Sequence, residues 1–334
     1  MSEHLERADR PAAVRVSAPG KMMIEGEYAV LEGAEAVVAA VDRRAFVTLA
    51  PAGSADEKTT TPTREMSATR RVVEARFGAI PGALTYDTES LAHAGMKLGL
   101  GSSAALAAAT AGALMRARGC ELGDPQIRAL ALELALEGHR ANAPQGSGAD
   151  VAAAMLGGFV RFRRLGDGVE THAVAWPAAL RSVVVWPTPK PGAAVTRTEV
   201  YVGAVKKLAV SDPAKHRGHM AALAAESERF VSALMASDIP EIIECFHDFG
   251  DAMGKLGTAA GVGIIDERLE KLRTHARECG GAAKPSGAGG GDVALALFSS
   301  EQGANEFRGR CAGVGFEVLS IGLGDTGERY EEQS

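Results

Sequence analysis

Residues 98–119, which read LGLGSSAALAAATAGALMRARG, place two glycines and two serines directly before an alanine-rich run. Alanine has the highest helix propensity and the run contains no proline, so the sequence predicts a helix over 102–118. The first N–H groups of a helix have no partner inside it. Small residues before this helix leave those groups accessible, which predicts a helix N-terminus able to bind an anion such as a phosphate.

Two other glycine-rich segments accompany this loop. Residues 18–33 read APGKMMIEGEYAVLEG and residues 284–292 read KPSGAGGGD. Successive backbone N–H groups in a curved, glycine-rich loop can bind an anion. Neither common nucleotide motif fits, because GxxxxGK[ST] is absent and the GxGxxA match at 99–104 lacks a buried strand before it. Taken singly, the loop at 99–104 could be a plain capped helix start, and 284–292 a tight turn.

The order of hydrophobic patterns predicts an α+β protein with two lobes. At 334 residues the chain exceeds what one hydrophobic core usually holds. The polar, turn-rich residues 53–70 predict an exposed loop. Near Thr188 the hydrophobic pattern changes to that of successive amphipathic helices. Predicted strands are 12–18, two segments within 34–50 around Asp42, 157–165, 180–187, 293–300 and 315–325. Predicted helices are 102–118, 124–138 capped by Asp124, 150–156, four amphipathic helices between 199 and 279, and 301–312.

Charge and composition exclude several classes of partner. The formal net charge is −6 and no run of five basic residues occurs, so we expect no nucleic acid and no anionic membrane surface as a partner. No stretch of 18 apolar residues and no apolar signal core is found, so a cytoplasmic protein is expected. The four cysteines lie far apart without CxxC spacing, which argues against a zinc site or a disulfide framework.

Taken in order, the three glycine-containing segments resemble the three motifs of the GHMP kinases, which phosphorylate small molecules such as galactose, homoserine, mevalonate and phosphomevalonate. The resemblance covers nearly the whole chain. It implies a ribosomal-S5-like N-terminal lobe with a left-handed βαβ unit, expected over 1–187, and a ferredoxin-like C-terminal lobe, expected over 188–334. It also implies that ATP and Mg²⁺ bind between the lobes.

The resemblance further implies which residues act on the nucleotide. Lys21 and Asp150 would be the catalytic pair, with Lys21 reaching the transferred phosphoryl group and Asp150 facing the acceptor hydroxyl. An adjacent ammonium favours the ionised carboxylate, which could then accept or orient a proton. The alternatives are a solvated loop lysine and a plain helix N-cap. The implied ATP-binding residues are Gly99, Leu100, Gly101, Ser102, Ser103 and Ala104, with Ser102 and Ser103 near Mg²⁺.

Within the family, a few positions bear on the acceptor. Tyr28, His139 and Asp292 stand where mevalonate kinases usually carry histidine, glutamate and glycine, and Lys97 lies just before the central loop. These residues look more like phosphomevalonate kinases. The implied reaction transfers the γ-phosphoryl group of ATP to (R)-5-phosphomevalonate and gives mevalonate 5-diphosphate for isoprenoid biosynthesis. Because this acceptor already carries a phosphate, a cation such as Lys97 is needed beside it.

The implied acceptor-binding residues come from all three motifs and the segment between the lobes. Two alternatives to a phosphomevalonate kinase stay open: a mevalonate kinase or another small-alcohol kinase of the family, and a non-catalytic regulator that binds a nucleotide or metabolite. Monomer and homodimer are both left open. The residues expected to bind the acceptor are Lys97, Tyr28, Ser147, Thr196 or Thr198, Ser286, Gly287, Ala288 and Gly289, and Asp292 is expected to anchor the last loop.

Overall fold

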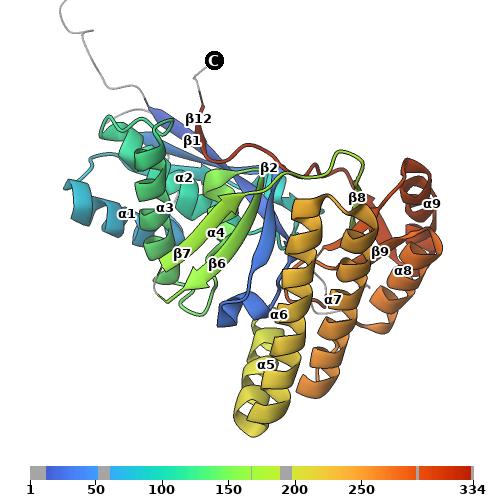
Figure 1. The fold of residues 1–334 in the computed structure, drawn as a ribbon. Helices are drawn as coiled ribbons and strands as arrows, with labels where there is room; N and C mark the ends of the chain where they lie inside the picture. Colours follow the sequence, from blue (N-terminus) through green and yellow to red (C-terminus); the bar gives the residue numbers. More distant parts are fainter. Residues whose placement is uncertain (1–12, 52–60, 167, 189–197, 291–292, 332–334) are drawn as a thin grey trace, which may run out of the picture.

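The chain folds into two β-sheets, each covered by helices (Figure 1). A computed structural model describes residues 13–51, 61–166, 168–188, 198–290 and 293–331. Runs of helices and runs of strands follow one another along the chain, and the paired strands are antiparallel, which confirms the α+β class. Within the described ranges, no helix combines the length and the apolar character that crossing a membrane requires.

The first sheet is built on two long strands, β1 (Val14–Glu25) and β2 (Ala36–Ala50), which pair antiparallel. The two strands expected around Asp42 are therefore one continuous strand. The sheet order is β12-β1-β2-β6-β7, and β3 also pairs with β2. The shorter members are β3 (Ala83–Asp87), β6 (Phe159–Leu165), β7 (Gly168–Ala173) and β12 (Arg329–Tyr330).

Helix α2 (Ser102–Ala117) packs directly on this sheet, close to the predicted bounds. Every residue from Ala104 to Met115 is buried, because the small alanine side chains let the helix backbone approach the strands closely. Around α2 lie α1 (Arg64–Phe77), α3 (Pro125–Arg140) and α4 (Ala149–Leu156) (Figure 1). The Asp124 side chain accepts hydrogen bonds from Gln126 and Ile127, which confirms it as the cap of α3.

Helix α1 contradicts part of the exposed loop predicted over 53–70. The Thr63 hydroxyl accepts a hydrogen bond from the Met66 N–H and caps the helix. Met66, Thr69 and Val73 are then buried on one face, against α2 and α3. The polar composition of this segment describes the outer face of a helix, so the tertiary contacts override the loop prediction.

The second sheet has the strand order β11-β8-β10-β9, and all neighbouring strands are antiparallel. In chain order this is 4-1-3-2, the arrangement of a ferredoxin-like sheet, as expected for the second lobe. The strands are β8 (Arg181–Pro187), β9 (Gly281–Pro285), β10 (Ala294–Phe298) and β11 (Phe316–Leu319). Helices α8 (Glu267–Glu278) and α9 (Glu301–Cys311) pack against this lobe.

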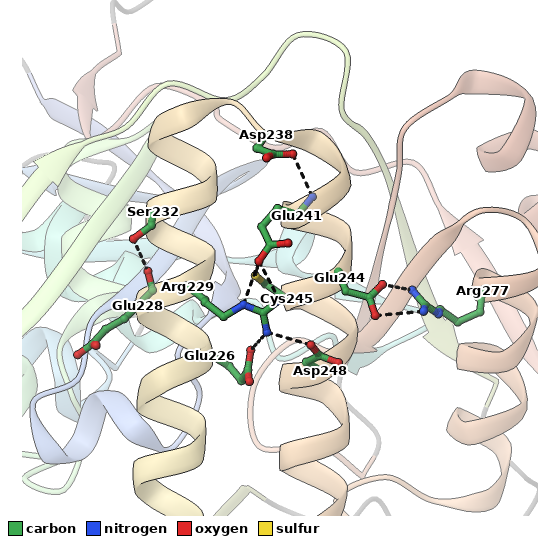
Figure 2. Close-up of polar contacts among 10 residues, drawn as sticks. All are labelled: Glu226, Glu228, Arg229, Ser232, Asp238, Glu241, Glu244, Cys245, Asp248 and Arg277. Carbon is green, nitrogen blue, oxygen red and sulfur yellow. Dashed lines mark hydrogen bonds and ion pairs between the residues drawn. The ribbon is translucent and has the colours of Figure 1, made fainter.

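Three further helices extend from the second sheet (Figure 1). They are α5 (Thr198–Ser211), α6 (Pro213–Ala236) and α7 (Ile239–Ala260), and with α8 they confirm the four predicted amphipathic helices. Figure 2 shows that Arg229 of α6 reaches carboxylates on α7, and that Glu244 of α7 pairs with Arg277 of α8. Charged side chains thus connect α6, α7 and α8 along their exposed faces.

Sheet membership does not follow the boundary expected between 187 and 188. Strand β8 precedes that boundary but belongs to the second sheet, and β12, at the far end of the chain, returns to β1 of the first sheet. Arg44 of β2 holds the returning segment, since its guanidinium donates to Asp325, Thr326 and Gly327. Long-range hydrogen bonds decide this arrangement, and a local hydrophobic pattern does not contain them.

Candidate active site

The first glycine-containing segment lies directly against the central loop. Lys21 of β1 donates its backbone N–H to the Leu100 carbonyl at 2.8 Å and its ammonium to the Gly99 carbonyl at 3.0 Å. A β-bulge separates Pro19 from Lys21 in the pairing with β2. A side chain at Gly20 would lie 2.7 Å from the Leu100 carbonyl oxygen, so glycine is what permits this close approach.

The N-terminus of α2 opens at this loop, as the sequence predicts. Gly101 is the N-cap with φ 76° and ψ 39°, a left-handed conformation that favours glycine, and no side chain caps the helix. The N–H groups of the first turn, at Ser102, Ser103 and Ala104, have no acceptor within the helix. Unpaired N–H groups at the positive end of a helix dipole suit a phosphate, so this terminus fits the nucleotide that the fold implies.

A buried histidine, His139, lies between Ser103 of the central loop and the Asp150 carboxylate. His139, in the last turn of α3, places Nε2 3.1 Å from Ser103 Oγ and 4.0 Å from Asp150 Oδ2. Asp150 stands in the first turn of α4, whose N-cap is Gly148 with φ 90°. Asp150 therefore is not the N-cap, and its Oδ1 accepts a hydrogen bond from the Val151 N–H at 3.0 Å.

A cavity of about 370 Å³ gathers side chains from both lobes. Its walls come from β1 and the turn after it, residues 143–147 with the start of α4, one side of α5, and residues 287–288. Six predicted site residues line it together: Lys21, Tyr28, Ser147, Asp150, Gly287 and Ala288, and Thr198 joins them. The expected pairing of Lys21 with Asp150 is not direct, since their charged atoms form no ion pair within 4.0 Å and the ammonium bonds to the Gly99 carbonyl.

Tyr28 joins the first motif to the third. It has φ 63° and ψ −55°, and the Ala29 N–H donates to the Glu27 carbonyl across it, so Tyr28 is the central residue of a rare γ-turn of positive φ. This turn aims the phenol at the other lobe, where its hydroxyl donates to the Ala288 carbonyl at 2.6 Å. Tyr28 thus shapes the cavity wall by fixing the last glycine loop.

A buried ion pair lies beside this contact. Lys284 at the end of β9 donates to Glu27 Oε1 at 2.5 Å, and the Gly287 N–H approaches the same oxygen at 3.3 Å. The ammonium is fully buried, 5.0 and 5.1 Å from the ring centres of Phe246 and Phe249. The cation–π contacts and the carboxylate compensate for the loss of water around this charge.

Glu25 shares the same buried region, two residues before Glu27. Burial raises the pKa of its carboxyl well above the usual range, while the Lys284 charge acts in the opposite direction. One buried lysine thus faces two carboxyl groups, of which Glu27 makes the direct contact. The pKa shift favours a neutral, protonated Glu25, which leaves Lys284 and Glu27 as the charged pair.

Several predicted residues lie elsewhere or act differently. Lys97 is exposed on the short strand β5 (Met96–Lys97), paired with β4 (Ala92–His93), and is not among the cavity-lining residues. Ser286 is buried and is not among the cavity-lining residues. A side chain at Gly289 would lie 2.5 Å from the Ile264 carbonyl oxygen, so this glycine permits packing inside the second lobe. Thr196 and Asp292 lie outside the described residues.

Sequence reasoning missed some residues that the cavity gathers. Glu27 and Lys284 stand at the centre of GEY and at the start of KPSG, so both lay within recognised motifs without an assigned role. Glu199 and Lys206 of α5 line the cavity as well. The helical period of α5 was visible in the sequence, but which face it turns to a cavity depends on the tertiary packing.

The residues present also suit the divalent cation that the fold implies. Within the described ranges, no group of three or more His, Cys, Asp or Glu side chains could hold a metal ion by itself. Magnesium usually keeps several waters and binds through substrate phosphates and one or two protein ligands. The Ser103 hydroxyl at the α2 terminus and the Asp150 carboxylate nearby are oxygen donors of the required kind.

Comparisons with known proteins match this architecture. The family model described as GHMP kinases N terminal domain matches residues 67–158, and the one described as GHMP kinases C terminal matches residues 220–314. A curated phosphomevalonate kinase of Streptomyces sp. (strain CL190) is 31% identical, with 85% of this chain and 89% of that protein covered. A mevalonate kinase of Pyrococcus furiosus is 28% identical, with 86% of this chain and 90% of that protein covered.

A solved structure shows the same fold. The Streptococcus pneumoniae phosphomevalonate kinase in complex with phosphomevalonate and AMPPNP superposes with a TM-score of 0.75 at 20% identity, covering 94% of this chain and 100% of that one. Together with the two family models and the 31% identical relative, the two-lobed architecture shows that this chain belongs to the GHMP kinase family.

Proposed function

We propose that this protein transfers the γ-phosphoryl group of ATP to (R)-5-phosphomevalonate and releases ADP and mevalonate 5-diphosphate. The observation that carries the proposal is the cavity between the lobes, in which Lys21 and Asp150 face the same space close to the uncapped N-terminus of α2. The 31% identical relative and the superposed structure, both called phosphomevalonate kinase, support this acceptor.

Each part of the site has a task in phosphoryl transfer, which depends on positioning and charge stabilisation. The N–H groups of Ser102, Ser103 and Ala104 bind phosphate oxygens of ATP. Lys21, held beside this loop by its bonds to Gly99 and Leu100, stabilises charge on the transferred group. The Asp150 carboxylate holds the acceptor oxygen in line and receives any proton that it carries. The Ser103 hydroxyl and the Asp150 carboxylate would hold Mg²⁺, which would supply positive charge to the phosphates.

Mevalonate is the second candidate acceptor. Mevalonate kinases recur among the relatives at 26 to 31% identity. The comparisons therefore favour mevalonate or 5-phosphomevalonate as the acceptor without deciding between the two. The exposed position of Lys97, outside the cavity wall, removes one argument for a pre-phosphorylated acceptor. Tyr28 also bears less on acceptor choice, because its hydroxyl is already bonded to Ala288.

The test is ADP release by the purified protein with ATP and Mg²⁺, comparing mevalonate with (R)-5-phosphomevalonate at matched concentrations. Turnover of the phosphate alone is expected. Asp150→Asn should lower kcat by about 10² to 10⁴-fold, because the amide keeps the shape of the side chain but loses the charged oxygen that positions the acceptor and takes up any proton on it. The exposed carboxylate variant Glu133→Gln is the matched control and should keep full activity.

Three other outcomes would change the proposal. Turnover of mevalonate alone would replace the acceptor and keep the phosphotransferase. Full activity of Asp150→Asn would remove the assigned role of this carboxylate. Tight ATP binding without ADP formation from either acceptor or other small alcohols would instead indicate a nucleotide-binding regulator.

A further inference from the structure

Helix α5 turns a single face toward the cavity. Glu199, Val202, Gly203 and Lys206 all line it, and their spacing of three, four and seven residues is that of one side of a helix. Seven residues correspond to about 10 Å along the helix axis. The cavity therefore extends from the start of α5 along about two of its turns.

The middle of this face is open and apolar. A Cβ added at Gly203 would meet no atom within 4 Å, so the helix leaves free space at this point. Val202 on the same face and Val30 and Leu31 of the turn after β1 supply the apolar lining. A short carbon skeleton suits this part of the cavity better than a charged group does.

Lys206 brings a positive charge to the far part of the same face. It is exposed, and within the described residues it forms no ion pair. Of the other charged residues at the cavity, Lys21 bonds to the Gly99 carbonyl and Glu27 is neutralised by Lys284. The Glu199 carboxylate belongs to the opposite end of the same helix face, seven residues or about 10 Å along the axis from Lys206. An ammonium on a flexible stem at the edge of a cavity is suited to bind an anionic group of a ligand.

We infer that Lys206 binds the carboxylate of the acceptor, at the end remote from the oxygen that receives the phosphoryl group. This inference rests on the proposed function, because the accepting end must lie at Asp150 and Lys21. The other end of the acceptor then extends along α5 past Gly203. Both 5-phosphomevalonate and mevalonate carry a carboxylate at that end. Lys206 therefore selects carboxylic acids, whichever of the two compounds is the acceptor.

The adjacent lysine offers a matched control for this inference. Lys207 is exposed on the same helix but does not line the cavity. Lys206→Met keeps the length and helix propensity of the side chain and removes its charge. We expect it to raise the acceptor KM by about 10- to 100-fold, the usual range for a lost charged hydrogen bond, with kcat and the ATP KM changed less than about threefold. Lys207→Met should leave all three values unchanged.

A change in the acceptor tests the chemical group directly. Converting the acceptor carboxylate to its methylamide should weaken turnover by the wild type, while Lys206→Met should discriminate little between acid and amide. Equal acid preference in wild type and Lys206→Met would overturn the inference, as would equal effects of the Lys206 and Lys207 variants.

A measurement of acceptor binding tests the carboxylate site independently of the proposed phosphoryl transfer. Calorimetric titration of mevalonate, 5-phosphomevalonate and their methylamides into the wild type and into both lysine variants needs no turnover. If neither acceptor is phosphorylated but the acids bind more tightly than the amides only when Lys206 is present, the proposed reaction fails and the carboxylate site stands. If Lys206→Met binds the acids as tightly as the wild type, the carboxylate site fails.

Discussion

At the scale of single residues, one buried ring atom connects the nucleotide loop to the proposed proton acceptor. Nε2 of His139 lies within hydrogen-bond distance of Ser103 Oγ and 4.0 Å from Asp150 Oδ2. Ser103 belongs to the first turn of α2 and Asp150 to the first turn of α4. In the proposed reaction Ser103 would bind the nucleotide and Asp150 the acceptor, so His139 would position both groups without contacting either ligand.

Substitution of His139 should separate positioning from packing. His139→Leu removes the polar atom and should lower kcat by about tenfold, since a lost polar contact is worth about 1 kcal/mol or somewhat more. His139→Gln can place an amide near the position of Nε2 and should recover most of that loss. Steady-state kinetics with unchanged circular dichroism measures this, with the acceptor KM expected to change little. Equal loss in both variants would indicate that only the packing of the ring matters.

At the scale of elements, the two longest helices of the second lobe, α6 and α7, are connected by charged contacts along their surface. Asp212 and Asp238 cap α6 and α7, and each is followed by a proline in the first turn. Arg229 of α6 reaches Glu226 on its own helix and Glu241 and Asp248 on α7, as Figure 2 shows. Hydrogen bonds to Glu241 and Asp248 raise the pKa of Arg229 above its ordinary value, so its guanidinium stays protonated at neutral and alkaline pH.

Removal of Arg229 should loosen the α6–α7 pair without affecting the site. Arg229→Met is expected to lower the free energy of unfolding by about 1 to 2 kcal/mol, because three half-exposed contacts are lost together. Lys271→Met, which removes the exposed pair with Glu267, should cost less than about 0.5 kcal/mol. Urea unfolding at low and high salt measures both. A loss for Arg229→Met that does not shrink at high salt would contradict the electrostatic explanation.

At the scale of the whole molecule, few buried polar contacts bind the lobes together at the site. Glu27 of the first lobe pairs with Lys284 of the second, and the Tyr28 hydroxyl donates to the Ala288 carbonyl beside it. Both contacts shape the cavity wall. The lobes are therefore held in a fixed relation where the acceptor would bind, and loss of this relation should affect both stability and acceptor binding.

A double-mutant cycle tests the buried pair. Glu27→Gln leaves the Lys284 charge buried without its counter-ion and should lower the free energy of unfolding by about 3 to 5 kcal/mol. Glu27→Gln combined with Lys284→Met removes both charges and should recover part of that loss. Urea unfolding of the wild type, both single variants and the double variant gives the coupling energy. Strictly additive losses would show that the two charges do not depend on each other.

The segment that returns to the first sheet carries a further buried carboxyl, that of Glu328. Glu328 is 1% exposed, and among the described residues neither carboxylate oxygen has a hydrogen-bond partner. It lies against Gly112 of α2, where any side chain would collide with the carboxylate. Burial raises the pKa of Glu328 to about 8, although Arg128 and Arg44 act in the opposite direction.

The sign of the resulting pH dependence follows from proton binding. Between about pH 4.5 and 8 the folded state keeps the Glu328 proton and the unfolded chain loses it, so stability falls as the pH rises, by at most about 1.4 kcal/mol per unit. Glu328→Gln should remove this slope. The free energy of unfolding of the variant relative to the wild type should therefore be higher at pH 8 than at pH 5. Urea unfolding at several pH values tests it, with exposed Glu133→Gln as control. A pH-independent difference between Glu328→Gln and wild type would contradict the raised pKa.

The sequence by itself determined the motifs of this protein and part of its local structure. The alanine-rich run and the glycines before it predicted α2 and its open N-terminus, and Asp124 before Pro125 predicted the start of α3. Such features depend on hydrogen bonds between residues a few positions apart, which composition and period reveal. The three motifs also indicated the family, because their order is a property of the chain.

Only the tertiary structure decided which residues share the cavity. It moved Lys97 to an exposed hairpin, brought Lys206 to the cavity, and paired Glu27 with Lys284 across 257 positions of sequence. It also turned the predicted loop at 64–70 into the first part of α1. These outcomes depend on packing and hydrogen bonds between distant segments, and a local pattern contains neither the partner of a side chain nor the direction in which a helix face points.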